Sequence, residues 1–166
     1  MSKAWSDGQP VTVNRVVWGD EEKAAIEAVF KNDWFGPGQF VGELAAGITD
    51  VTGIRYIQPV NSGSSGLLLA VQALKQAGRL PADGLILHPA LTFPTSIAPC
   101  IQSGYRPVFV DIDPETYQID LDQAEETSRK YSTAIVGAVL PHILGNIVDM
   151  ERFSAIMGDR PFIEDC

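Results

Sequence analysis

Continuous apolar runs separated by helical patterns constrain the fold of this chain more than any other feature of its sequence. Most of the runs are apolar throughout, which is typical of strands buried on both faces of a parallel sheet. About five strands are predicted, over residues 54–60, 84–89, 107–113, 134–140 and 161–166. Helices are predicted between them, over residues 64–76, 95–102, 121–131 and 150–157, the second broken near Pro99. The pattern predicts a three-layer α/β fold, with a mainly parallel sheet and helices on both faces.

The residues before the first predicted strand are predicted to form an arm and two helices. Residues 1–19 carry scattered polar groups and one short strand-like piece over residues 11–17, so we predict an N-terminal arm. Helices are predicted over residues 20–31 and 39–52, the second capped by Gly53. Because no linker follows, we predict that residues 20–166 form one α/β domain.

Charge and hydropathy exclude several classes of protein. The formal net charge of −9 argues against a binder of nucleic-acid backbones, which relies on clustered Lys and Arg. No apolar run approaches the roughly 20 residues needed to span a bilayer, so we expect no membrane partner and a cytoplasmic protein. The two cysteines, Cys100 and Cys166, match neither a disulfide framework nor a metal site.

A turn of small polar residues joins the first predicted strand to its helix. Gly63 and Gly66 permit a tight backbone, and Ser62, Ser64 and Ser65 suit a helix N-terminus. The free N–H groups and the dipole of such a terminus attract anions, so the turn is a candidate phosphate site. A capped helix with no ligand is the alternative from the turn alone.

Further polar or aromatic residues follow the other strands, and the carboxyl ends of parallel strands meet at one edge of a sheet. Phe93 follows the second strand, His142 the fourth, and Asp165 ends the last. A phosphate joined to a flat heteroaromatic ring would suit these groups, with Phe93 on the ring face and Asp165 on a protonated ring nitrogen. Phe93 could instead be a core residue, and His142 could cap a loop.

Several familiar motifs are missing. The sequence contains no GxGxxG and no GxxxxGK[ST], which disfavours dinucleotide and ATP binding, and it has no GxSxG nucleophile elbow. Asp111, Asp113 and Asp120 lack the spacing of a hard-cation loop, so we expect no metal site. They are expected to be solvated acids at a strand end and a turn.

A set of ordered motifs resembles the N-terminal part of the DegT/StrS family of pyridoxal-phosphate-dependent sugar aminotransferases. The motifs occupy residues 34–38, 61–65, 92–95, 107–113, 116–120, 142–146 and 163–165. The resemblance implies the large domain of the type I PLP-dependent transferase fold, incomplete within residues 20–166. A chain that ends on a buried strand at two acids is also expected to be a fragment.

The resemblance implies a site for pyridoxal 5'-phosphate or pyridoxamine 5'-phosphate. Gly63 and Ser64 would hold the phosphate, Phe93 would lie against the pyridine ring, and Asp165 would pair with the ring nitrogen. The family's Schiff-base lysine lies after the glutamate–aspartate strand, so we expect it beyond Cys166. No catalytic residue is therefore assigned in this chain, and residues 1–166 alone are expected to be inactive.

Within the family, residues 92–104 and 142–146 are closer to the nucleotide-sugar 3-dehydrase branch, in which a histidine replaces the lysine. The resemblance implies an aminotransferase of polysaccharide or sugar biosynthesis, with the pyridoxamine-phosphate-dependent 3-dehydrase as alternative. Either would act on a nucleotide-linked keto-sugar, bound in part by His142, and the aminotransferase would use Glu or Gln as amino donor. A homodimer is expected at full length, and a non-catalytic phosphate-binding module is the other alternative.

Overall fold

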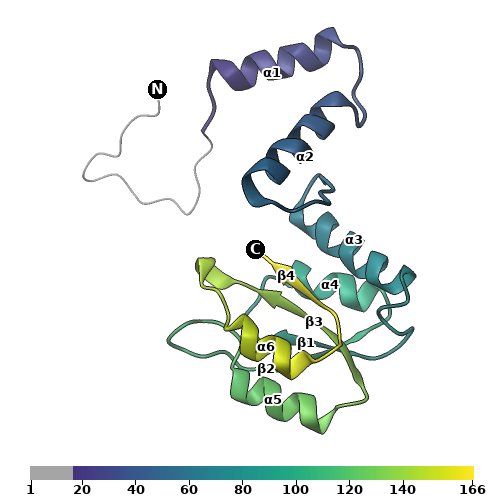
Figure 1. Ribbon diagram of the computed structural model, residues 1–166, viewed down its shortest axis with the longest axis vertical. Coiled ribbons are helices and arrows are strands. Elements are labelled where there is room, and N and C mark those ends of the chain that lie inside the picture. Colours follow the sequence, from purple (N-terminus) through teal and green to yellow (C-terminus); the bar gives the residue numbers. More distant parts are fainter. Residues whose placement is uncertain (1–16) are drawn as a thin grey trace, which may run out of the picture. The chain divides into compact units, whose positions relative to one another are not determined.

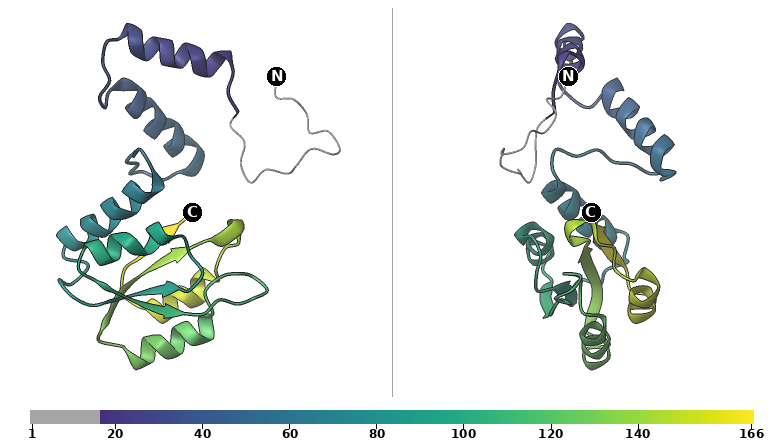
Figure 2. Two further views of the ribbon diagram at one scale, coloured as in Figure 1. Left: turned by 180° about the vertical axis from the view of Figure 1, so that it is seen from behind. Right: turned by 90° about the vertical axis from the view of Figure 1, so that its left-hand side faces the viewer.

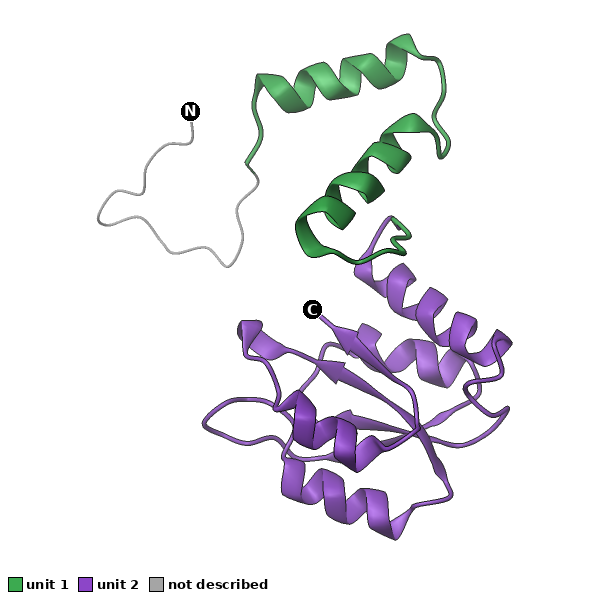
Figure 3. Ribbon diagram, in the orientation of Figure 1, with its two compact units in different colours: residues 1–59 green, residues 60–166 purple. Residues whose placement is uncertain are grey.

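The computed structural model describes residues 17–166, and the chain divides into two compact units, residues 1–59 and 60–166 (Figure 3). Most of the predicted arm, including nearly all of the strand expected over residues 11–17, lies outside the described residues. In the part that is described, no helix is long and apolar enough to cross a membrane.

The first unit contributes two helices at their predicted positions, α1 (Asp20–Lys31) and α2 (Gln39–Thr52). The Trp34 indole N–H donates to the Pro37 carbonyl at 2.9 Å, which fixes the turn between them. Gly53 ends α2 with φ of 73°, a left-handed conformation that glycine adopts without strain.

The second unit is a four-stranded sheet in which every pair of neighbouring strands is parallel (Figure 1). Its strands are β1 (Leu85–Pro89), β2 (Arg106–Val110), β3 (Ile135–Pro141) and β4 (Phe162–Asp165), in the order β2-β1-β3-β4. The helices are α3 (Gly63–Gln76), α4 (Pro94–Gln102), α5 (Leu121–Lys130), α6 (Met150–Met157) and the short 3-10 helix η1 (Ile143–Gly145). The predicted α/β class and the parallel sheet are confirmed.

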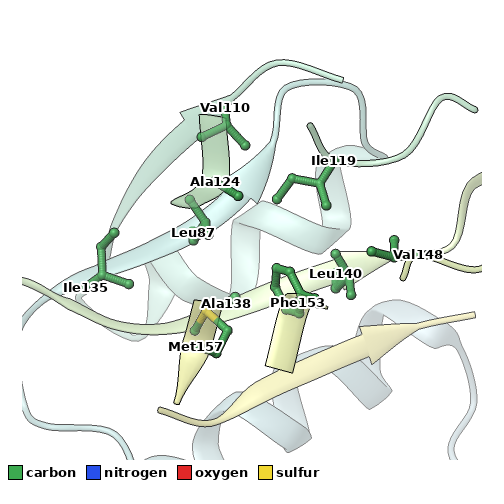
Figure 4. Close-up of a cluster of buried hydrophobic side chains, with 10 residues drawn as sticks. All are labelled: Leu87, Val110, Ile119, Ala124, Ile135, Ala138, Leu140, Val148, Phe153 and Met157. Atoms are coloured by element: carbon green, nitrogen blue, oxygen red, sulfur yellow. The ribbon is translucent and has the colours of Figure 1, made fainter. Parts of the chain in front are cut away.

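Helices cover both faces of the sheet, as the right-hand view of Figure 2 shows. An apolar cluster lies between the sheet and the helices on each face. One cluster joins the strands to α5 and α6 around Phe153, which is fully buried (Figure 4). The other joins Ile86, Val139 and Ile163 of the strands to α3 and α4. Strand side chains alternate between the two faces of the sheet. A residue in either cluster therefore identifies the face of the residues that follow it in the same strand.

Two sequence predictions are wrong. Residues 54–60 form no strand, since no neighbouring segment of the described chain supplies the ladder hydrogen bonds that an apolar run needs to become one. Helix α4 is not broken at Pro99 but continues to Gln102. Pro99 is buried, and its carbonyl accepts from the Ser103 N–H at 3.0 Å and from the Ser103 hydroxyl at 2.7 Å, so the helix continues through the proline to its C-terminal end.

His88 in β1 is a polar side chain inside the core. It is 0% exposed, and neither imidazole nitrogen has a hydrogen-bond partner among residues 17–166. Desolvation by burial lowers the pKa of His88 from 6.5 to about 4, so the ring is neutral at pH 7. The unfolded chain therefore binds a proton at His88 at a higher pH than the folded chain does.

We predict that His88 makes the free energy of unfolding fall as pH drops from 6.5 toward 4, because protonation then favours the unfolded chain. The pKa displacement corresponds to about 3 kcal/mol. A His88→Leu variant should lose this part of the pH dependence while keeping at least wild-type stability at pH 7, since it removes an unpaired buried polar group. Urea unfolding from pH 4 to pH 7 measures the free energy of unfolding. An equal pH dependence in the wild type and in His88→Leu would contradict the prediction.

Candidate functional site

The N-terminus of α3 presents free backbone donors at an exposed position. Ser62 is the N-cap, and its hydroxyl oxygen accepts from the Ser65 N–H at 3.2 Å. Gly63 and Ser64 follow, both exposed, and their N–H groups have no partner within the helix. A Cβ built at Gly63 would meet no atom within 4 Å, so the space in front of this turn is open.

Helix α4 lies beside this turn. A shallow pocket of about 200 Å³ is lined by Ser64 and Ser65 from α3 and by Thr95 and Pro99 from α4, among others. The start of α3 is therefore adjacent to the start of α4 within the second unit.

Asp165 ends β4 at the same edge of the sheet. Ile163 packs in the cluster beneath α3 and α4, so Asp165, two residues later, projects from that same face. The Ser96 hydroxyl of α4 donates to Asp165 Oδ2 at 2.6 Å. The other carboxylate oxygen, Oδ1, accepts no hydrogen bond from any residue in the described range 17–166.

Phe93 immediately precedes α4, in an extended conformation with φ of −73° and ψ of 143°. Its side chain is 68% exposed, so the alternative that Phe93 is a core residue is wrong. Pro94 occupies the first helical position, where its ring suits the required φ and its missing N–H removes no intrahelical bond.

His142 lies after β3, and its ring contacts Glu164 rather than Asp165. The Nε2 atom lies 3.0 Å from Glu164 Oε2, and Nδ1 accepts from the Val148 N–H at 3.4 Å. Because Nδ1 is an acceptor, Nε2 carries the proton and donates to Glu164. The ring is nearly buried and both nitrogens are engaged, which fits the alternative that His142 caps a loop.

The structure thus brings Gly63, Ser64, Phe93 and Asp165 to the α3–α4 side of one sheet edge. It places the His142 ring with Glu164, whose side chain alternates to the opposite face from Asp165. Asp113 accepts from the Glu115 N–H at 2.7 Å and Asp120 caps α5, as expected of turn acids.

Sequence reasoning missed Ser96 and the role of Glu164. Ser96 is 1% exposed, and a lone serine within the apolar helix 94–102 was the available signal for a buried polar contact. Nothing in the sequence indicates that its partner is Asp165, 69 residues away.

The family model that matches the chain is the DegT/DnrJ/EryC1/StrS aminotransferase family, over residues 17–166. A curated relative, the GDP-4-keto-6-deoxy-D-mannose 3-dehydratase of Escherichia coli, is 32% identical over 148 residues, covering 88% of this chain and 37% of its own length.

Solved structures show the same similarity. The E. coli GDP-4-keto-6-deoxy-D-mannose-3-dehydratase with bound hydrated PLP superposes with a TM-score of 0.83 at 29% identity, covering 92% of this chain and 39% of that one. The sugar aminotransferase CalS13 from Micromonospora echinospora gives a TM-score of 0.80 at 31% identity, over 93% of this chain and 42% of that one. The chain spans about two fifths of the length of these relatives.

We predict that the His142 ring anchors the loop that follows β3. A His142→Ala variant loses the contacts to Glu164 and to the Val148 N–H, so amide hydrogen exchange at Val148 and in η1 should become faster. A Glu164→Gln variant keeps an oxygen acceptor for the Nε2 proton and is the matched control, with exchange near that of the wild type. Unchanged exchange at Val148 in the alanine variant would disprove the anchoring role.

Proposed function

Because the chain belongs to the DegT/DnrJ/EryC1/StrS aminotransferase family, we propose that the edge of the sheet between α3 and Asp165 binds pyridoxal 5'-phosphate or pyridoxamine 5'-phosphate. The observation that carries the proposal is the juxtaposition of free helix N–H groups, an exposed aromatic ring and a carboxylate with one free oxygen. Each of these groups matches a different part of the cofactor.

The N-terminus of α3 suits the phosphate. A phosphate placed there would meet the unpaired N–H groups of Gly63 and Ser64 and the positive end of the helix dipole. The absent Cβ of Gly63 permits close approach to the backbone. Backbone donors also explain how a chain of net charge −9 would hold an anion without a cluster of basic side chains.

Asp165 and Phe93 suit the ring. The free Oδ1 of Asp165 would accept the N–H of a protonated pyridine nitrogen and hold the proton there. Phe93 offers an exposed ring face at the start of α4. When bound, the cofactor supplies a ring that takes up electrons from a neighbouring carbon, and it does so best with the nitrogen protonated.

The proposed reaction is transamination of a nucleotide-linked keto-sugar, with Glu or Gln as amino donor. The similarity to the sugar aminotransferase CalS13 supports this reading. We propose no catalytic residue within residues 1–166, because the Schiff-base lysine that the family resemblance implies is expected beyond Cys166.

Loss of the sugar C3 hydroxyl is the second candidate reaction, favoured by the 32% identity to the GDP-4-keto-6-deoxy-D-mannose 3-dehydratase. An assay of the full-length protein with a nucleotide-linked 4-keto-6-deoxy sugar, glutamate and an electron-transfer partner separates the two. Transamination yields an amino sugar and 2-oxoglutarate, whereas the dehydrase yields a 3-deoxy sugar and water, with two electrons supplied by the partner or by oxidation of glutamate. We also propose that the full-length protein is a homodimer. Contact of His142 with the nucleotide-linked sugar and a cytoplasmic location of the protein stay predictions.

We predict that an Asp165→Asn variant of the full-length protein binds pyridoxamine 5'-phosphate at least about tenfold more weakly than the wild type, because a charge-assisted hydrogen bond becomes a neutral one. Calorimetric titration measures this affinity without any need for turnover. Glu164→Gln is the matched control, since it neutralises the adjacent carboxylate of the same strand on the other face. No binding by the wild type, or equal affinity in the wild type and Asp165→Asn, would contradict the proposed site.

A further inference from the structure

We propose that Ser96 is a positioning residue that holds the Asp165 carboxylate in the orientation needed to pair with a ring nitrogen. The inference rests on the proposed function, since it concerns the same site. It adds a residue that has no contact of its own with the cofactor in this proposal and that acts through Asp165.

The Ser96 hydroxyl has one proton, and that proton is committed to Asp165. The donor–acceptor distance of 2.6 Å is typical of an O–H donating to an ionised carboxylate. Ser96 is 1% exposed, so water does not compete for the contact. The bond engages Oδ2 and leaves Oδ1 free, which divides the two carboxylate oxygens between the protein and a ligand.

Ser96 also connects Asp165 to Phe93. The backbone N–H of Ser96 donates to the Phe93 carbonyl at 2.9 Å, closing the first turn of α4. Ser96 therefore bonds to both residues that are proposed to contact the cofactor ring. Its backbone N–H bonds to the Phe93 carbonyl, and its side chain bonds to the Asp165 carboxylate. This arrangement sets the Phe93 backbone and the Asp165 carboxylate in a fixed register.

Ser103 provides a matched comparison on the same helix. It lies just after the other end of α4, is 4% exposed, and its hydroxyl donates to the Pro99 carbonyl at 2.7 Å. A Ser103→Ala variant removes this bond and the one that the Ser103 hydroxyl oxygen accepts from the Gln72 side-chain amide at 2.8 Å, at the end of α4 away from Ser96. Any general loss of helix stability should appear in both alanine variants.

The test compares two ligands in the full-length protein, pyridoxamine 5'-phosphate and its 1-deaza analogue, in which a C–H replaces the ring nitrogen. The analogue cannot pair with Asp165, so it reports on the rest of the site. We expect Ser96→Ala to weaken binding of pyridoxamine 5'-phosphate by about fivefold to tenfold and to leave analogue binding unchanged. Ser103→Ala should change neither affinity, and Ser96→Thr, which retains a hydroxyl, should recover most of the loss.

Two results would overturn the positioning role while leaving the proposed site intact. One is Ser96→Ala binding pyridoxamine 5'-phosphate as the wild type does, while Asp165→Asn binds it weakly. The other is an equal loss of both ligands in Ser96→Ala, which would indicate a purely structural effect. A wild type that does not prefer pyridoxamine 5'-phosphate over the analogue would overturn the ring-nitrogen pairing and the Ser96 role together.

Discussion

Parallel pairing of the strands is the constraint on which the candidate site depends. In register with β3, β4 places Pro141 opposite Asp165, and the carboxyl ends of β1, β3 and β4 share one edge of the sheet. The segment that leaves β1 at this edge enters α4, so Phe93 and Ser96 reach the region of Asp165 although they are remote from it in sequence. Buried apolar clusters on both faces maintain this arrangement and leave the edge itself to polar groups.

The alternation of side chains along β4 gives two adjacent acids different surroundings. Glu164 lies on one face, where the His142 ring donates to it, and Asp165 lies on the other, where Ser96 donates to it. The His142 backbone N–H also donates to the Asp165 carbonyl at 2.9 Å, so the end of β4 is held from both sides. A rigid strand end is what a carboxylate needs if it is to meet a ligand atom in one orientation.

Much of the fold follows from the sequence, because continuous apolar runs report burial on two faces. The strand predicted over residues 84–89 is β1 (Leu85–Pro89), and the helix predicted over residues 150–157 is α6. Residues 54–60 were mispredicted because an apolar run reports hydrophobicity but not the presence of a pairing strand. His88 and Ser96 escaped notice for a related reason, since a polar residue in an apolar pattern gives no sign of what it meets in three dimensions. The placement of Gly63, Ser64 and Asp165 at one edge was predictable because helix N-termini and parallel strand ends have known geometry.

The central claim is that the second unit binds pyridoxal 5'-phosphate or pyridoxamine 5'-phosphate through the N-terminus of α3 and Asp165. A crystal structure of the full-length protein with pyridoxamine 5'-phosphate tests it most directly. The account predicts phosphate oxygens within hydrogen-bonding distance of the Gly63 and Ser64 N–H groups, and the ring nitrogen at Asp165 Oδ1 with Ser96 still on Oδ2. A cofactor bound elsewhere, or one with its ring nitrogen turned away from Asp165, would contradict it.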